Sequence, residues 1–167
     1  RSRGLGDVYK RQLWCRDCLT QSRADLGAAW EPAWMSAPIW YFFLPPGACG
    51  PRAMLGVWLP SMDKAGRHYP FILAALADDP AALAQGGQWL ALAEAEGLAG
   101  VVDDKPHEAI AAALAAPVED AALPPPGWWT QGSPLVRPRR FDHPGLLPAA
   151  TQAGAMLRDP QPVEGLN

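Results

Sequence analysis

The sequence predicts an α/β protein in which helices cover both faces of a β-sheet. Three runs at 39–44, 53–61 and 69–77 are rich in β-branched and aromatic residues and have the length of strands. The last two are apolar at odd and even positions alike, which is typical of strands that are buried on both faces. Segments with helical signals stand before and after these runs, so they can supply the two covering layers.

Composition limits the class of protein. A chain of 167 residues favours one domain, and 49% apolar with 19% charged residues indicates a folded globular chain. The net charge of −3 argues against nucleic-acid binding, and no apolar run reaches the ~18 residues that a membrane-spanning helix needs. Three cysteines are too few for a disulfide framework, and their odd number predicts a reducing compartment, for which we expect the cytoplasm.

The opening segment RSRGLGDVYKRQ, residues 1–12, has no helix or strand period. It resembles a translated sequencing-adaptor read-through, so we expect it to be non-native and leave it out of the fold prediction. The natural N-terminus is then expected to be missing. A single domain is expected over 13–159, followed by a disordered tail at 160–167.

Two helical segments precede the first strand. We expect a helix over 13–27 and a short second helix or turn over 31–37, which Pro38 ends. The second and third strands are joined by a polar hairpin.

A helix is expected after the third strand. Asp79 before Pro80 has the form of an N-cap and first helical residue, and Gly97 predicts the end of the helix after about Glu96. Its buried side is expected to carry Leu83, Leu90 and Ala93.

The C-terminal half supplies further elements. A helix is expected to begin at Pro106 with Glu108 in its first turn, to bury Ile110 and Leu114, and to end at Pro117. The segment 123–127 reads as a stiff proline connector. We expect 133–141 to be an edge strand because its two prolines cannot donate to a ladder, and 146–158 to be a closing helix before a frayed tail.

The segment WLPSMDKAGRHYPF, residues 58–71, places Ser61 and His68 close together with an acid between them. A serine hydrolase is one interpretation, but the G-x-S-x-G elbow is absent. Asp63, Lys64 and Gly66 are typical turn residues between two strands. We therefore favour a structural hairpin in which Asp63 and Arg67 pair across the turn.

Two other patterns suggest chemistry. WCRDC at 14–18 has the form of a thiol oxidoreductase motif, and Cys15 and Cys18 with a histidine could also hold zinc. Two cysteines one turn apart on a helix explain the motif more simply, and we expect neither a metal nor a cofactor. Three arginines, Arg137, Arg139 and Arg140, could grip a phosphate or an acidic partner, although charges that protect a sheet edge are the favoured explanation.

The Trp128-Trp129 pair is expected to lie in an extended segment. Successive residues of a strand point to opposite faces, so one indole is expected in the core and the other at the surface, where tryptophan is a frequent interface anchor.

Three segments together resemble a known family. SAPIWYFFLPPGACG, AMLGVWLPSMDKAGRHYPF and GWWTQGSP, in this order, are similar to TagF (also called ImpM), an accessory protein of bacterial type VI secretion systems. The most specific part is the pattern P-S-x-D-x-x-G-R-x-Y-P at 60–70, and the resemblance extends over about 13–159. Family members open with a G-K-L-P segment followed by G-D-F, which supplies a first strand. That segment is absent here, so the sheet is expected to lack one strand and to have an unpaired edge.

The resemblance implies a three-layer α/β/α sandwich around a mostly antiparallel or mixed sheet. It also implies a non-catalytic, post-translational repressor of type VI secretion that binds the cytoplasmic forkhead-associated scaffold protein, Fha. Some relatives are fused to a phosphatase domain, which this chain does not contain. A structural subunit of the secretion apparatus is the alternative without catalysis.

Residue roles are a hypothesis that starts from the polar, turn-forming motif of the hairpin, which the fold alone does not require. The residues expected to maintain the fold are Pro38, Trp40, Pro60, Pro70 and Trp128. The surface expected to bind the partner is the end of the hairpin with a neighbouring indole, made of Ser61, Asp63, Gly66, Arg67, His68 and Trp129.

Overall fold

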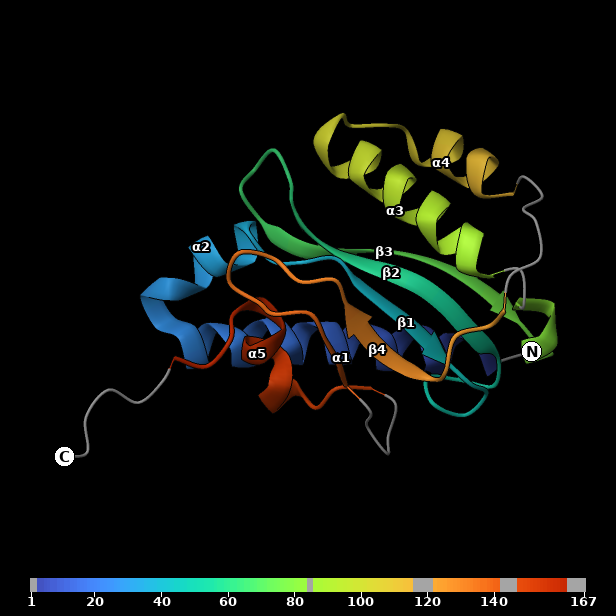
Figure 1. Cartoon of the computed structure of the whole chain (residues 1–167), viewed down its shortest axis with the longest axis horizontal. Coiled ribbons are helices and arrows are strands. Elements are labelled where there is room, and N and C mark those ends of the chain that lie inside the picture. Colours follow the sequence, from blue (N-terminus) through green and yellow to red (C-terminus); the bar gives the residue numbers. More distant parts are fainter. Residues whose placement is uncertain (1–2, 84–85, 116–121, 142–146, 162–167) are drawn as a thin grey trace.

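The computed structural model describes residues 3–83, 86–115, 122–141 and 147–161, with side chains described from Gln12 onwards. A five-stranded antiparallel sheet runs through its centre in the order β3-β2-β1-β4-β5 (Figure 1). The strands are β1 (Trp40–Leu44), β2 (Ala53–Met62), β3 (His68–Ala77), β4 (Gly127–Thr130) and β5 (Arg139–Phe141).

Helices cover the two faces of this sheet (Figure 1). One layer contains α1 (Arg3–Leu26), α2 (Trp30–Met35) and α5 (Ala153–Leu157); the other contains α3 (Gly86–Val102) and α4 (His107–Leu114). Three short 3₁₀ turns complete the described elements: η1 (Gly27–Ala29), η2 (Pro80–Leu83) and η3 (Ala150–Gln152). The predicted α/β sandwich with an antiparallel sheet is confirmed.

The alternation of side chains along β1 builds the two cores. Trp40, Phe42 and Leu44 face α1 and α5, whereas Tyr41 and Phe43 face α3. All five are buried, and full burial of a side chain of this size contributes roughly 1.5–3 kcal/mol. β2 is apolar on both faces in the same way, so the central strands hold the two helical layers together.

Gly56 allows β2 to pack closely against its two neighbouring strands, β1 and β3. A Cβ atom at this position would lie 2.4 Å from the Leu73 carbonyl oxygen and 2.6 Å from Cζ of Phe42. The Phe42 ring therefore occupies the space that any other residue at position 56 would fill.

The boundaries of two helices, α1 and α3, differ from the prediction. α1 begins at Arg3, not at residue 13, so the opening segment that was expected to have no helix period is helical from Arg3 onwards. Asp79 does cap a turn, since its Oδ1 accepts the Ala81 N–H at 2.9 Å, but that turn is η2. α3 begins at Gly86 and continues past Gly97, whose missing side chain makes room for Leu59.

The C-terminal segments are also shorter than predicted. Only Arg139–Phe141 pair as a strand within 133–141, because Ser133 and Val136 close a tight turn on each other. β5 does lie at the sheet edge, as its prolines indicated. The closing helix is reduced to Ala153–Leu157, and the predicted stop at Pro117 falls outside the described residues. β4 confirms that the two tryptophans lie in an extended segment.

β3 departs from the expectation of burial on both faces. It is an edge strand, and three of its large side chains, those of Tyr69, Ile72 and Leu76, are 38–40% exposed. An apolar run alone does not separate a central strand from a partly covered edge strand.

Candidate functional site

The connection between β2 and β3 is a tight polar turn, as predicted. Oδ1 of Asp63 accepts the backbone N–H groups of Ala65 and Arg67, both at 2.9 Å. Oδ2 accepts Nε of Arg67 at 2.7 Å, which confirms the expected pair. Gly66 has a φ of +79°, a conformation that favours glycine. One carboxylate therefore organises the whole turn.

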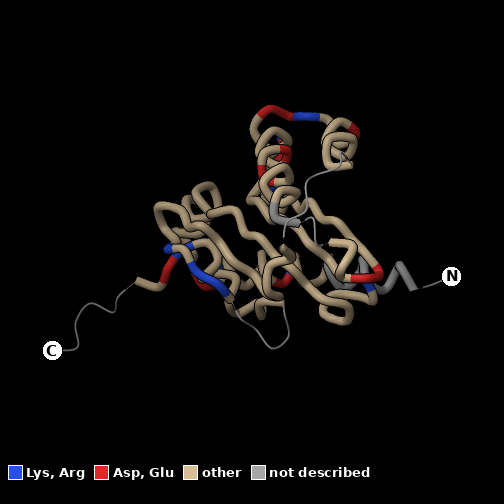
Figure 2. The backbone as a smooth tube through the Cα atoms, turned by 45° about the vertical axis from the view of Figure 1, so that its right-hand side comes forward, with Lys and Arg blue, Asp and Glu red and all other residues tan. Residues whose placement is uncertain are grey.

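Charge interactions tie this turn to the loop between α3 and α4. The backbone N–H of Arg67, followed by its guanidinium, lowers the pKa of Asp63. The Lys64 ammonium lies 2.9 Å from the Asp104 carboxylate, and this contact raises the pKa of Lys64. Strands β1 to β4 carry no lysine, arginine, aspartate or glutamate, and Figure 2 shows charged residues on the α3–α4 loop. The turn is thus a charged projection from a largely uncharged sheet.

An aromatic cluster supports the base of the hairpin. Nε1 of Trp34 donates to the Ser61 carbonyl oxygen at 3.1 Å, which attaches α2 to the end of β2. The His68 ring lies edge-on to Trp30, with ring centres 4.9 Å apart, and its Nε2 is 3.8 Å from a Glu31 carboxylate oxygen.

Burial reduces the predicted binding surface. Ser61 is buried, and the His68 side chain is only 11% exposed. Of the hairpin residues expected to meet a partner, Asp63, Gly66 and Arg67 remain at the surface. We call residues 63–67 the hairpin tip. Lys64 was predicted as a turn residue but was not included in the expected binding surface, although its place between Asp63 and Gly66 signals exposure.

Trp129 is not beside the hairpin, contrary to the expectation. The strand register places it opposite Tyr41, with two strands between β4 and β3. It stacks on the Tyr41 ring at 5.9 Å and lies under the Arg140 guanidinium. Trp128 is buried in the core on one face of the sheet, as predicted for one of the two indoles. Trp129 lies on the other face, as predicted, but it is half-buried and not fully at the surface.

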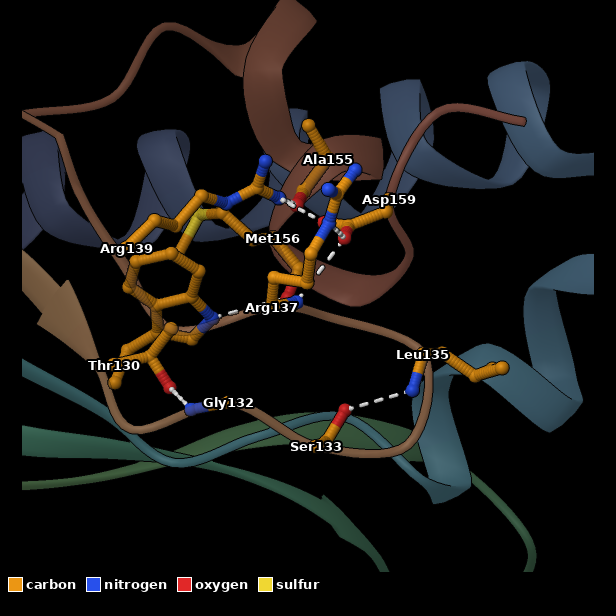
Figure 3. Close-up of polar contacts among 10 residues, drawn as sticks. Thr130, Gly132, Ser133, Leu135, Arg137, Arg139, Ala155, Met156 and Asp159 are labelled. Carbon is orange, nitrogen blue, oxygen red and sulfur yellow. Dashed lines mark hydrogen bonds and ion pairs between the residues drawn. The ribbon is translucent and has the colours of Figure 1, made fainter. Parts of the chain in front are cut away.

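The residues after this pair form a structural network (Figure 3). Thr130 Oγ1 donates to the Ile39 carbonyl at 2.8 Å and accepts the Gly132 N–H at 3.1 Å. Ser133 Oγ accepts the Leu135 N–H at 3.3 Å. The T-x-G-S part of the motif therefore turns the chain out of β4.

Asp159 binds two of the three arginines (Figure 3). Its Oδ2 accepts both the backbone N–H of Arg137 at 3.1 Å and Nε of the same residue at 3.0 Å, and this contact lowers the pKa of Asp159. Arg139 lies 3.3 Å from Oδ1 and also donates to the Ala155 carbonyl. Asp159 is thus anchored, whereas it was expected to begin the frayed tail.

The third arginine has backbone partners. Arg140 donates to the Pro125 and Pro126 carbonyls, in addition to its contact with Trp129. Each of the three guanidinium groups therefore already has an acceptor within the chain, which weakens the case for a phosphate grip.

The WCRDC motif lies inside α1 and not at the N-terminus of a helix. Burial, followed by the neighbouring Cys15, raises the pKa of Cys18 to about 12. A thiol with so high a pKa is a poor nucleophile at neutral pH. Among the described residues, no cluster of histidine, cysteine and acidic side chains could hold a metal ion.

Ser61 also borders a polar cleft of about 280 Å³ between β3 and the start of α4. His107, Asp104 and Glu108 line the same cleft. In the part of the chain that the structure describes, no hydrogen bond joins Ser61 to His107 or His68. The described helices also include none that is long and apolar enough to cross a bilayer.

Comparison with known proteins gives a family match and a structural match that agree. The model of the TagF N-terminal domain, described as type VI secretion system-associated, matches residues 8–116. The crystal structure of PA0076 from Pseudomonas aeruginosa PAO1 is similar over 100% of this chain and 91% of that chain, with a TM-score of 0.75 and 27% identity. No curated protein matches the chain. Because the family model covers well over half of the sequence, the chain belongs to the TagF N-terminal domain family, which is associated with type VI secretion.

Proposed function

We propose that the protein is a non-catalytic, post-translational repressor of type VI secretion that acts in the cytoplasm by binding the forkhead-associated scaffold protein. The observation that carries the proposal is the family match together with a turn between β2 and β3 that exposes the charged side chains of Lys64 and Arg67. A scaffold bound in this way is not available to the secretion machinery, so repression follows from occupancy.

A binding role accounts for the candidate catalytic residues better than an enzyme does. Nucleophilic catalysis by serine requires a base within hydrogen-bond reach, and Ser61 has none in the described residues. The thiol of Cys18 is held in its protonated form by burial. The rival activities are tested directly by a fluorophosphonate probe for Ser61 and by serine substitution of Cys15 and Cys18.

The hairpin tip is the surface that we expect to meet the scaffold. The Arg67 side chain is 82% exposed and that of Lys64 is 90% exposed, each beside one carboxylate. Exposed ion pairs contribute only ~0–1 kcal/mol to stability, so a partner can exchange them at little cost. Two neighbouring cations indicate an acidic surface on the scaffold.

Three variants separate recognition from folding of the turn. Arg67→Ala removes an exposed guanidinium but leaves both backbone hydrogen bonds to Oδ1 of Asp63. Asp63→Asn retains the oxygen that accepts these bonds, whereas Asp63→Ala removes it. In a pull-down with the scaffold, we expect Arg67→Ala to bind at least several-fold more weakly while its circular dichroism stays unchanged. Normal binding by a folded Arg67→Ala would move the interface away from the hairpin tip.

Deletion distinguishes a repressor from a subunit of the apparatus. Loss of a repressor raises secretion of effector proteins into the medium, and complementation by the wild-type gene restores the low level. Loss of a structural subunit abolishes secretion. An unchanged or abolished level would refute the proposed function irrespective of the hairpin variants.

A further inference from the structure

α3 has the reverse of the charge pattern expected for a surface helix. Its only charged side chains are those of Glu94 and Glu96, and both turn toward the protein. Glu94 accepts the Tyr41 hydroxyl of β1 at 2.6 Å, and Glu96 accepts the ammonium of Lys105 from the α3–α4 loop. A helix at the protein surface normally directs its charges to solvent and its apolar residues to the core. The outward face of α3 therefore contains no charge.

This outward face is an apolar stripe. Leu98 is 42% exposed and Val102 is 73% exposed, so both side chains point into solvent. Figure 1 shows α3 at the periphery of the molecule, with α4 beside it. The name α3 stripe is used for four exposed residues, spaced by four, three and four positions: Ala91, Ala95, Leu98 and Val102. This spacing keeps them on one side of the helix and is typical of a helix that packs against another helix.

The α3 stripe is complementary to itself when two copies run antiparallel. If Ala95 of one copy lies opposite Leu98 of the second, then Ala91 lies opposite Val102, and every large side chain meets a small one. A parallel arrangement would place Leu98 against Leu98 and Ala95 against Ala95. One distance between the helix axes cannot suit both of these layers. A shift of the antiparallel register by one heptad keeps only two of the four residues of the stripe in contact.

Charge also favours the antiparallel arrangement. Asp103 and Asp104 are exposed and directly follow the last residue of the α3 stripe. In an antiparallel pair they lie beside the N-terminal half of the second α3, which begins with the uncharged residues Gly86, Gly87 and Gln88. The positive end of a helix dipole favours negative charge there. A parallel pair would instead bring the two Asp103 carboxylates together.

We propose that two copies of this chain associate through the α3 stripe, with the helices antiparallel and Ala95 of one copy opposite Leu98 of the other. A two-fold axis between these two layers closes the assembly as a dimer. The inference is independent of the proposed repression, and it involves neither the hairpin tip nor an edge of the sheet. Because the stripe has only four residues in each copy, the association is expected to be in the micromolar range or weaker.

The oligomeric state tests the proposal. Sedimentation velocity of the full chain, from low micromolar to the highest soluble concentration, is expected to show a species of twice the monomer mass that grows with concentration. Ala95→Glu places a charge in the centre of the interface and is expected to abolish that species. Ala112→Glu, the same change at an exposed position of α4, is the matched control and is expected to retain it.

A cross-link tests the register without relying on the glutamate variant. An alanine in each layer lets the helix axes approach to about 8 Å, so that facing residues come within reach of a disulfide. When Ala95→Cys is mixed with Leu98→Cys under oxidising conditions, we expect a disulfide between positions 95 and 98, identified by peptide mapping. Ala112→Cys mixed with Leu98→Cys is the control and is expected to form none.

Each of the other outcomes overturns the proposal. A wild-type chain that stays monomeric at every concentration refutes it, and a dimer that survives Ala95→Glu uses a different surface. A disulfide that joins position 98 to itself in preference to position 95 would indicate parallel helices and refute the register. If Ala95→Glu does not fold by circular dichroism, the cysteine mixtures decide, and the absence of the link between positions 95 and 98 then refutes the proposal.

Discussion

Trp34 is predicted to be the residue that fixes the hairpin to the body of the protein. It is 2% exposed, stacks on Trp30 with ring centres 5.2 Å apart, and donates Nε1 to the Ser61 carbonyl. Trp34→Phe keeps an aromatic ring but removes this donor and about a third of the buried ring atoms. The lost hydrogen bond costs about 1–1.5 kcal/mol, and the lost ring area and new cavity cost a further ~1–2 kcal/mol.

The expected destabilisation of about 2–3.5 kcal/mol is measured by urea unfolding followed by far-UV circular dichroism. For a chain of this size it corresponds to a fall in Tm of roughly 4–14 °C. The control is Met35→Ala in the next position of α2, which is 58% exposed and is expected to change stability by less than about 0.5 kcal/mol. A Trp34→Phe variant within about 0.5 kcal/mol of wild type would refute the argument.

Two further predictions follow from the pKa shifts. Because burial raises the pKa of Cys18 from 9.0 to about 12, its thiolate fraction at pH 8 is roughly 1000-fold lower than that of an ordinary thiol. Iodoacetamide should therefore label Cys18 far more slowly in the native protein than in the urea-unfolded protein. Equal labelling rates, measured by mass spectrometry of the peptide, would contradict this prediction. The pKa of Asp63 is lowered in the folded state, so its contribution to stability is complete above the unfolded value near ~3.9 and is lost as the pH falls through the folded pKa. Asp63→Asn should therefore lose less stability than wild type between about pH 5 and pH 2, and parallel losses in urea titrations would exclude this role for Asp63.

The strands and the hairpin turn could be predicted from the sequence because each depends on residues that are close together in the chain. Strands β1, β2 and β3 were placed within one residue of their observed bounds because dense β-branched and aromatic runs end at proline or turn residues. The hairpin was predicted with Asp63 as the partner of Arg67, because an aspartate and a glycine three residues later are typical of a tight turn. Such features depend on neighbours in the chain.

Features that depend on distant contacts were not predictable. Gly97 reads as the end of a helix, but it lies within α3 because Leu59 of a separate strand needs the space. The position of Trp129 depends on strand order, which periodicity does not encode. The partners of Arg137 and Arg139 lie some twenty residues further along the chain, at Asp159, in a segment that was expected to be frayed.

The residues of the P-S-x-D-x-x-G-R pattern divide into those that the fold requires and those that it does not. Ser61 provides the carbonyl that Trp34 binds, Asp63 organises the turn, and Gly66 adopts the positive φ that closes it. These roles explain the pattern without a partner, so the pattern alone cannot be read as a binding motif. The Arg67 guanidinium is different, because the turn keeps both backbone bonds to Asp63 without it and its side chain is 82% exposed. Within this pattern, Arg67 is therefore the residue that we expect to contact a partner, together with its neighbour Lys64.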